Sequence, residues 1–123
     1  MPLSSLPKVA KEQLIAVKAE VFQISSVKRI NSDVNCTLHK QEVVVRDPTS
    51  SAKLALWEYY VGCLEINQTY EFKNIRVKGY GMDHYLNTPM KETFLYTPCA
   101  PYEQPLATVD SDLIESAMSR MAA

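Results

Sequence analysis

The sequence predicts an all-β fold, a small closed barrel of five short strands followed by a C-terminal helix. Two observations support this prediction. Five short segments alternate apolar and polar side chains with a period of two, and turn-forming residues separate them at spacings of about 8–15 residues. The chain has 123 residues, of which 46% are hydrophobic and 22% charged, which is enough for one domain with a core.

Residues 1–13 show no periodicity, and their two prolines and two adjacent serines indicate a linker or flexible arm. The first strand begins at Leu14, where apolar and polar residues start to alternate. The alternation slips between Val21 and Ile24, and this slip predicts a β-bulge. We interpret the barrel itself as residues 14–93.

Residues 28–37 are polar and are predicted to form a turn. The second strand covers Leu38–Arg46, and its β-branched run Val43–Val45 indicates burial on both faces. Residues 47–51 contain Asp, Pro and Ser and are typical of a tight turn.

The third strand is Ala52–Trp57, in which the leucines point inward and Lys53 and Trp57 point outward. A short helical or turn connection over 58–67 leads to the fourth strand, Thr69–Gly79. The phase of that strand changes at Lys73-Asn74, which predicts a second bulge. Beyond it the outward positions are Arg76, Lys78 and Tyr80. A hairpin then leads to the fifth strand, His84–Thr88.

The segment 94–109 is predicted to be extended because it contains three prolines. Residues 110–123 form a predicted helix with acidic residues in its first turns. The helix has one apolar stripe, made of Leu113, Ile114, Ala117, Met118 and Met121. Two interpretations stay open for this stripe: it caps its own barrel, or it is a surface for self-association or a protein partner.

The net charge of −1 is at first sight unfavourable for a nucleic-acid binder, whose surface is usually basic. The charge is unevenly distributed, however. Residues 14–91 carry ten Lys or Arg and eight Asp or Glu, a sum of +2, whereas residues 92–123 sum to −4. The acidity belongs to the C-terminal part, and the predicted barrel is weakly basic.

Several classes of function are disfavoured. No apolar run approaches the roughly 18 residues that span a bilayer, so we expect no membrane association. Cys36, Cys63 and Cys99 have no paired spacing, which indicates free thiols in a reducing compartment. Neither metal-ligand spacing nor a catalytic motif is present, so we expect no enzyme activity, metal or cofactor.

Several stretches of the chain resemble the single-stranded-DNA-binding domains of the replication protein A large subunit, which have the oligonucleotide-binding (OB) fold. The resemblance covers Leu14–Thr93. Two departures are Ser50-Ser51 and Glu58, where that family often has glycine. The matching stretches are Val43–Thr49, Lys53–Glu58, Gly62–Leu64, Tyr70–Val77, Gly79–Gly81 and Tyr85–Thr88.

The resemblance implies an OB barrel, with Greek-key strand order, that binds single-stranded DNA by base stacking, largely independent of sequence. Its stacking aromatics match Trp57 and Tyr80, and the strand phases independently turn both outward. Tyr85 is a third candidate platform. The candidate phosphate contacts are Lys28, Arg29, Arg46, Lys53, Arg76 and Lys78.

The same resemblance implies a nuclear protein of DNA replication, repair or recombination. A second interpretation belongs to another class, an OB module that serves as a protein-interaction adaptor in a larger complex. The weak basicity and the apolar helix favour it. RNA in place of DNA is a third interpretation with the same fold.

Overall fold

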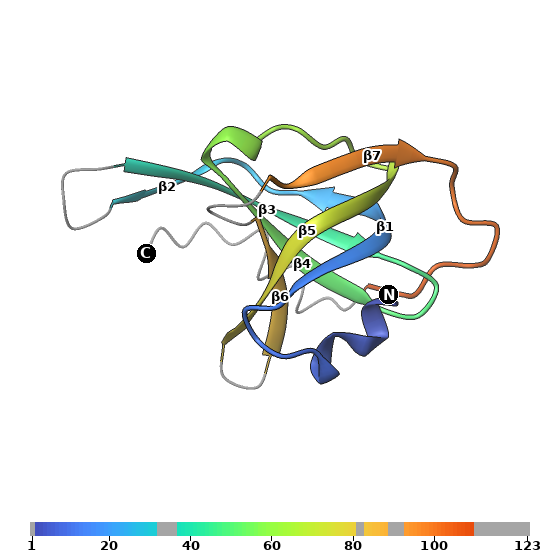
Figure 1. The fold of residues 1–123 in the computed structure, drawn as a ribbon. Helices are drawn as coiled ribbons and strands as arrows, with labels where there is room; N and C mark the ends of the chain where they lie inside the picture. The colour runs from blue at the N-terminus through green and yellow to red at the C-terminus, as the bar shows by residue number, and fades with distance from the viewer. Residues whose placement is uncertain (1, 32–36, 81–82, 89–92, 110–123) are drawn as a thin grey trace.

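The computed structural model describes residues 2–31, 37–80, 83–88 and 93–109, which fold into one curved sheet closed on itself (Figure 1). Two short 3₁₀ helices accompany the strands in this part of the chain. The elements are η1 (Leu3–Lys8), β1 (Leu14–Ile24), β2 (Lys28–Asn31), β3 (Thr37–Arg46), β4 (Ser51–Trp57), η2 (Glu58–Tyr60), β5 (Thr69–Tyr80), β6 (Asp83–Asn87) and β7 (Leu95–Cys99).

The barrel closes because the long strand β1 pairs with two different strands. Its first half, Leu14–Glu20, lies antiparallel to β5, and its second half, Glu20–Ile24, lies antiparallel to β3. The strand order is therefore β1-β3-β4-β6-β5 and back to β1, with a parallel pair between β4 and β6. The predicted five-stranded barrel is confirmed, while β2 and β7 extend it at β3 and β5.

Both predicted bulges are confirmed. In β1, Val21 and Gln23 lie opposite consecutive residues of β3, so one extra residue is inserted between them. In β5, Phe72 and Ile75 lie opposite residues of β1 that are only two apart, which places the insertion at Lys73-Asn74. Asn74 has a φ of 61°, the left-handed conformation that Asn tolerates better than most residues. Each bulge returns the apolar side chains to the core side.

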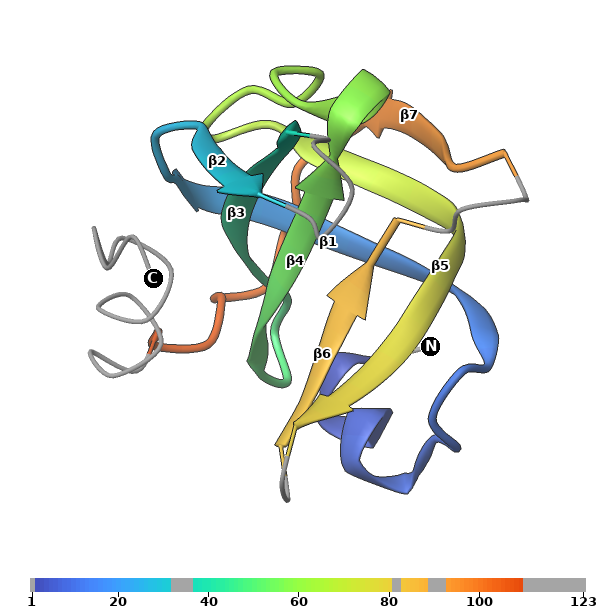
Figure 2. The same ribbon diagram turned by 90° about the vertical axis from the view of Figure 1, so that its left-hand side faces the viewer.

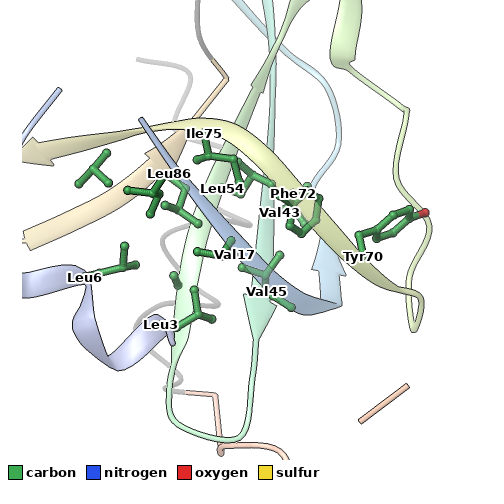
Figure 3. Packing of buried hydrophobic residues seen from close by; sticks show 14 of the residues in the cluster. Leu3, Leu6, Val17, Val43, Val45, Leu54, Tyr70, Phe72, Ile75 and Leu86 are labelled. Carbon is green, nitrogen blue, oxygen red and sulfur yellow. The ribbon is translucent and has the colours of Figure 1, made fainter. Parts of the chain in front are cut away.

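The core fills the barrel with aliphatic side chains from every barrel strand (Figure 3). Phe72 and Phe94 stack within it, with ring centres 5.9 Å apart. The run Val43–Val45 is fully buried, as predicted. Val43 and Val45 belong to the core, whereas Val44 points to the opposite side of the sheet.

The expectation of a flexible arm at residues 1–13 is wrong for the described part of that segment. Leu3 and Leu6 of η1 are buried in the core cluster (Figure 3), and the following Val9 belongs to the same cluster. The Leu3 N–H donates to the buried Asp47 carboxylate over 2.8 Å. Leu3 and Leu6 are three residues apart, which is the period of a 3₁₀ helix, so their side chains lie on one side of η1.

The expectation of a turn over residues 28–37 is also wrong in part. Lys28–Asn31 form β2, and this strand pairs with the first residues of β3. The predicted extended segment contains β7, which adds to β5. The short helical connection after Trp57 is present as η2. The predicted C-terminal helix, with its stripe from Leu113 to Met121, lies outside the described residues.

Candidate nucleic-acid interface

One side of the sheet, facing away from the core, combines aromatic rings with lysines, and we call it the front face. Figure 2 shows the strands that carry it, with β4 and β6 side by side. Side chains alternate between the two sides of a strand. Leu54, Leu56 and Leu86 point into the core, so the residues next to them point to the front face. The front face contains Lys28, Lys40, Glu42, Val44, Lys53, Ala55, Trp57, Tyr85, Asn87, Arg76 and Lys78.

Glu42 lies at the centre of the lysine group. Its side chain is only 7% exposed, and its carboxylate oxygens lie 3.1 Å from Lys28 Nζ and 3.4 Å from Lys40 Nζ and Lys53 Nζ. The three lysines come from three strands, β2, β3 and β4. One carboxylate therefore neutralises part of a threefold positive charge, and the group as a whole remains cationic.

The electrostatics of Glu42 follow from this arrangement. Burial alone would raise its pKa, but Lys53, Lys28 and Lys40 together outweigh that effect and hold the pKa below its ordinary value. The backbone of Glu42 is held by Ser25, whose Oγ accepts the Glu42 N–H over 2.9 Å. The carboxylate is thus charged and fixed in position at neutral pH.

Two partly exposed aromatic rings flank the lysine group. Trp57 ends β4, where its backbone N–H donates to Thr88 Oγ1 over 3.3 Å, and Lys40 Nζ lies 5.2 Å from the centre of its ring. Tyr85 lies on β6, and Lys53 Nζ is 5.7 Å from its ring centre. Each aromatic ring therefore has an ammonium group within cation–π distance.

Arg76 and Lys78 continue the front face onto β5. Lys78 lies beside Tyr85 in the β5–β6 hairpin, and Arg76 lies beside Asn87. Both cations contact Glu12, which lies two residues before the start of β1. The structure thus brings six of the predicted site residues onto one surface: Trp57, Tyr85, Lys28, Lys53, Arg76 and Lys78.

Two predicted phosphate contacts lie outside the lysine group, and Arg46 does so at the end of β3 although it shares the outward phase of Glu42 and Val44. Arg46 donates from Nε and Nη2 to Glu20 on β1, over 3.2 and 3.1 Å, and its guanidinium lies 4.7 Å from the centre of the Phe22 ring. Arg29 is exposed, but it follows Lys28 directly in β2, so its side chain points to the opposite side of the strand. Tyr80 ends β5, and its side chain lies outside what the structure describes.

Sequence reasoning missed Lys40, Glu42 and Asn87. Lys40 and Glu42 lie on either side of Gln41 in β3 and point outward. The alternation of side chains along the strand could therefore have identified both as surface residues. Asn87 alternates with the inward Leu86, and its Oδ1 is buried without a hydrogen-bond partner in the structure described. Their mutual contacts depend on strand register, which the alternation does not determine.

Other chemistry finds no site in the described part of the chain. Its His, Cys, Asp and Glu side chains form no group of three or more that could hold a metal ion. None of its helices has the length and apolar character needed to cross a membrane. Burial raises the pKa of the Cys63 thiol to about 11, so this side chain is protonated and a poor nucleophile at neutral pH.

Comparison with solved structures identifies the architecture. The chain is similar to a chain of a replication protein A heterotrimer bound to single-stranded DNA, with a TM-score of 0.67 and 22% identity over 80% of this chain and 24% of that one. It is also similar to the replication factor A related protein of Methanobacterium thermoautotrophicum, with a TM-score of 0.62 and 14% identity over 80% and 92% of the two chains.

A third similar structure is Pot1pC of Schizosaccharomyces pombe bound to single-stranded DNA, with a TM-score of 0.58 and 14% identity over 84% of this chain and 88% of that one. No protein-family profile and no curated protein sequence matches the chain. The closed five-stranded barrel is therefore an OB fold. It is shared with domains related to replication protein A, and the present chain spans about a quarter of the length of the replication protein A chain.

Proposed function

We propose that this OB domain binds single-stranded nucleic acid, DNA in preference to RNA, on its front face. One observation carries the proposal: Trp57 and Tyr85 lie on neighbouring strands of one surface, each with a lysine within cation–π distance. Two of the similar structures hold single-stranded DNA, which supports the same ligand here.

Binding combines stacking with phosphate contacts. Each base that stacks on Trp57 or Tyr85 contributes about 1–3 kcal/mol, without distinguishing one base from another. Lys40 lies beside Trp57, Lys53 lies beside Tyr85, and Lys28 shares the Glu42 carboxylate with both. In this proposal the three lysines attract the phosphates that connect the stacked bases. Tyr80 adds a further stacking side chain in this proposal, as its position in the β5–β6 hairpin predicts.

The salt dependence follows from the number of cations. Three to five phosphate contacts lower log K by about 0.7 each for every tenfold rise in salt concentration. Arg76 and Lys78 belong to these contacts. Arg46 contributes less because it is paired with Glu20 at the end of β3, and Arg29 because it points to the opposite side of β2. We therefore propose moderate affinity, largely independent of sequence, for the domain by itself.

The biological setting is proposed on the same basis. We propose a non-enzymatic binding module without a cofactor, acting in DNA replication, repair or recombination in the nucleus. RNA remains the alternative ligand, and a comparison of oligo-dT with oligo-U distinguishes the two.

A protein-interaction adaptor is the second candidate function, and one observation favours it. Apolar side chains are exposed at the β7 end of the barrel, with Ile66, Leu95 and Tyr96 exposed by 50%, 47% and 37%. The apolar stripe predicted at Leu113–Met121 would add to such a surface. Sedimentation of the protein and of a Leu113→Asp, Met118→Asp variant tests self-association through the stripe, and identical masses would exclude it.

The proposed function is tested by titrating the protein into a fluorescently labelled oligo-dT of about 15 nucleotides, a length within the site size of OB folds. We expect the Trp57→Ala, Tyr85→Ala double variant to bind at least about 30-fold more weakly, from the loss of two stacking platforms. Tyr59→Ala is the control, because Tyr59 is 90% exposed and packs on Tyr60. Equal affinity of the double variant and the wild type would exclude stacking, and absence of wild-type binding at low salt would exclude the function.

A further inference from the structure

The chain segment that enters the barrel lies against the end of the front face. The Glu12 N–H donates to Val77 O over 2.6 Å, and the Val77 N–H donates to Gln13 O over 2.9 Å, so residues 12 and 13 prolong the ladder between β1 and β5. A side chain on Gly79 would overlap the Lys11 side chain at its Cδ and Cε atoms. The segment is therefore packed closely on β5.

This packing brings the Glu12 side chain onto two cations of the front face. Lys78 Nζ lies 2.9 Å from both Glu12 carboxylate oxygens. Arg76 Nη1 donates to the Glu12 backbone oxygen over 2.8 Å and lies 3.8 Å from Oε2. Glu12 has a φ of 71°, an unfavourable conformation for a residue with a side chain.

We propose that the Glu12 carboxylate occupies a phosphodiester site formed by Arg76 and Lys78, and that nucleic acid displaces it on binding. This inference rests on the proposed function. A carboxylate and a phosphodiester each present two charged or partly charged oxygens to donors such as Arg76 and Lys78. The two groups therefore compete, and the site holds either the Glu12 carboxylate or a phosphodiester. Glu12 thereby lowers the affinity of the front face for single-stranded nucleic acid.

Exposure distinguishes Glu12 from Glu42, the other carboxylate that contacts lysines on this face. The Glu12 side chain is 59% exposed and the Glu42 side chain 7%. Water and a phosphate group reach Glu12, and exposed ion pairs are weak, so exchange costs little. Glu42 is buried among three cations and stays in place when nucleic acid binds. Regulation by displacement is therefore assigned to Glu12 alone.

The test compares Glu12→Gln with Glu71→Gln in the oligo-dT titration at two salt concentrations. Glu71 is an exposed acid on β5, so its substitution makes the same change in net charge. We expect Glu12→Gln to bind about two- to fivefold more tightly at low salt, the range of a surface ion pair, with a steeper salt dependence. Glu71→Gln is expected to change affinity by less than half as much. Equal effects of the two variants, or unchanged affinity of Glu12→Gln, would overturn the proposal.

A second readout separates this inference from the proposed function. Inorganic phosphate is titrated into the wild type and Glu12→Gln, and binding is followed by NMR through the Arg76 and Lys78 side-chain signals. Tighter phosphate binding by Glu12→Gln supports the site even if the wild type does not bind oligo-dT. Identical phosphate titrations would contradict it even if oligo-dT binds. Thermal unfolding of both variants confirms that they are folded as the wild type is.

Discussion

Lys40 and Trp57 lie opposite each other across the β3–β4 ladder, with the ammonium group of Lys40 5.2 Å from the centre of the indole ring. The same ammonium group lies 3.4 Å from Glu42, and Lys53 has the corresponding position between Glu42 and Tyr85. One buried carboxylate thus connects both pairs of cation and ring. This network fixes the positions of both rings and their lysines on the front face relative to one another.

Lys40→Met should weaken DNA binding without abolishing it, because the variant retains both rings and loses one cation. The slope of log K against log salt should fall in magnitude by about 0.7, the value for one phosphate contact on a single strand. Oligo-dT titrations at four salt concentrations measure this slope. Lys73→Met is the control, since Lys73 is exposed at the β5 bulge. Identical slopes for Lys40→Met and the wild type would show that Lys40 meets no phosphate.

Glu42→Gln should destabilise the fold at neutral pH by about 1–2 kcal/mol, because the amide cannot replace the charged contacts of a buried carboxylate. The lysines retain 22–23% exposure, so water screens part of the interaction and keeps the cost moderate. Urea unfolding at pH 7 measures the difference in unfolding free energy. A variant as stable as the wild type would contradict a stabilising role for the network.

The lowered pKa of Glu42 predicts that the unfolding free energy depends on pH in the acidic range. The folded-state pKa of Glu42 lies below its ordinary value of 4.5, so its stabilisation is complete above that value and is lost as the pH falls through the folded-state pKa. The stability difference between the wild type and Glu42→Gln should therefore shrink on acidification below pH 4.5. Urea unfolding of both proteins between pH 7 and pH 3 measures this stability difference. A difference that stays constant over this range would contradict the lowered pKa of Glu42.

Leu3→Ala and Leu6→Ala should each lower the unfolding free energy by about 2–4 kcal/mol, since both side chains are almost completely buried. Ser4→Ala is the matched control, because Ser4 lies between them in η1 and is exposed. Thermal and urea unfolding give the comparison. Losses below about 0.5 kcal/mol, the size of a surface effect, would show that η1 is not part of the barrel core.

The barrel could be predicted from the sequence because its strands are amphipathic. Even the two bulges could be located, since an inserted residue shifts the phase of all later side chains, as it does at Lys73-Asn74. The outward positions of Lys53 and Trp57 followed from the same alternation.

The remaining features depend on contacts between distant segments. Leu3, Leu6 and Val9 are spaced by three residues, and only the first two lie in η1. This apolar pattern is too short to be recognised in a segment that contains prolines. β2 exists because it pairs with β3, and its own four residues carry no strand pattern. The partners of Glu12 and Glu42 depend on strand register and on the path of the entering chain, which local patterns do not specify.

The central claim, that single-stranded nucleic acid stacks on the front face, is tested most directly by the fluorescence of Trp57, the only tryptophan in the chain. Unlabelled oligo-dT is titrated into the protein at low salt while the tryptophan emission is recorded. Stacking predicts saturable quenching, with a midpoint that coincides with the binding curve of the labelled oligonucleotide. Binding that leaves the emission of Trp57 unchanged would contradict the claim.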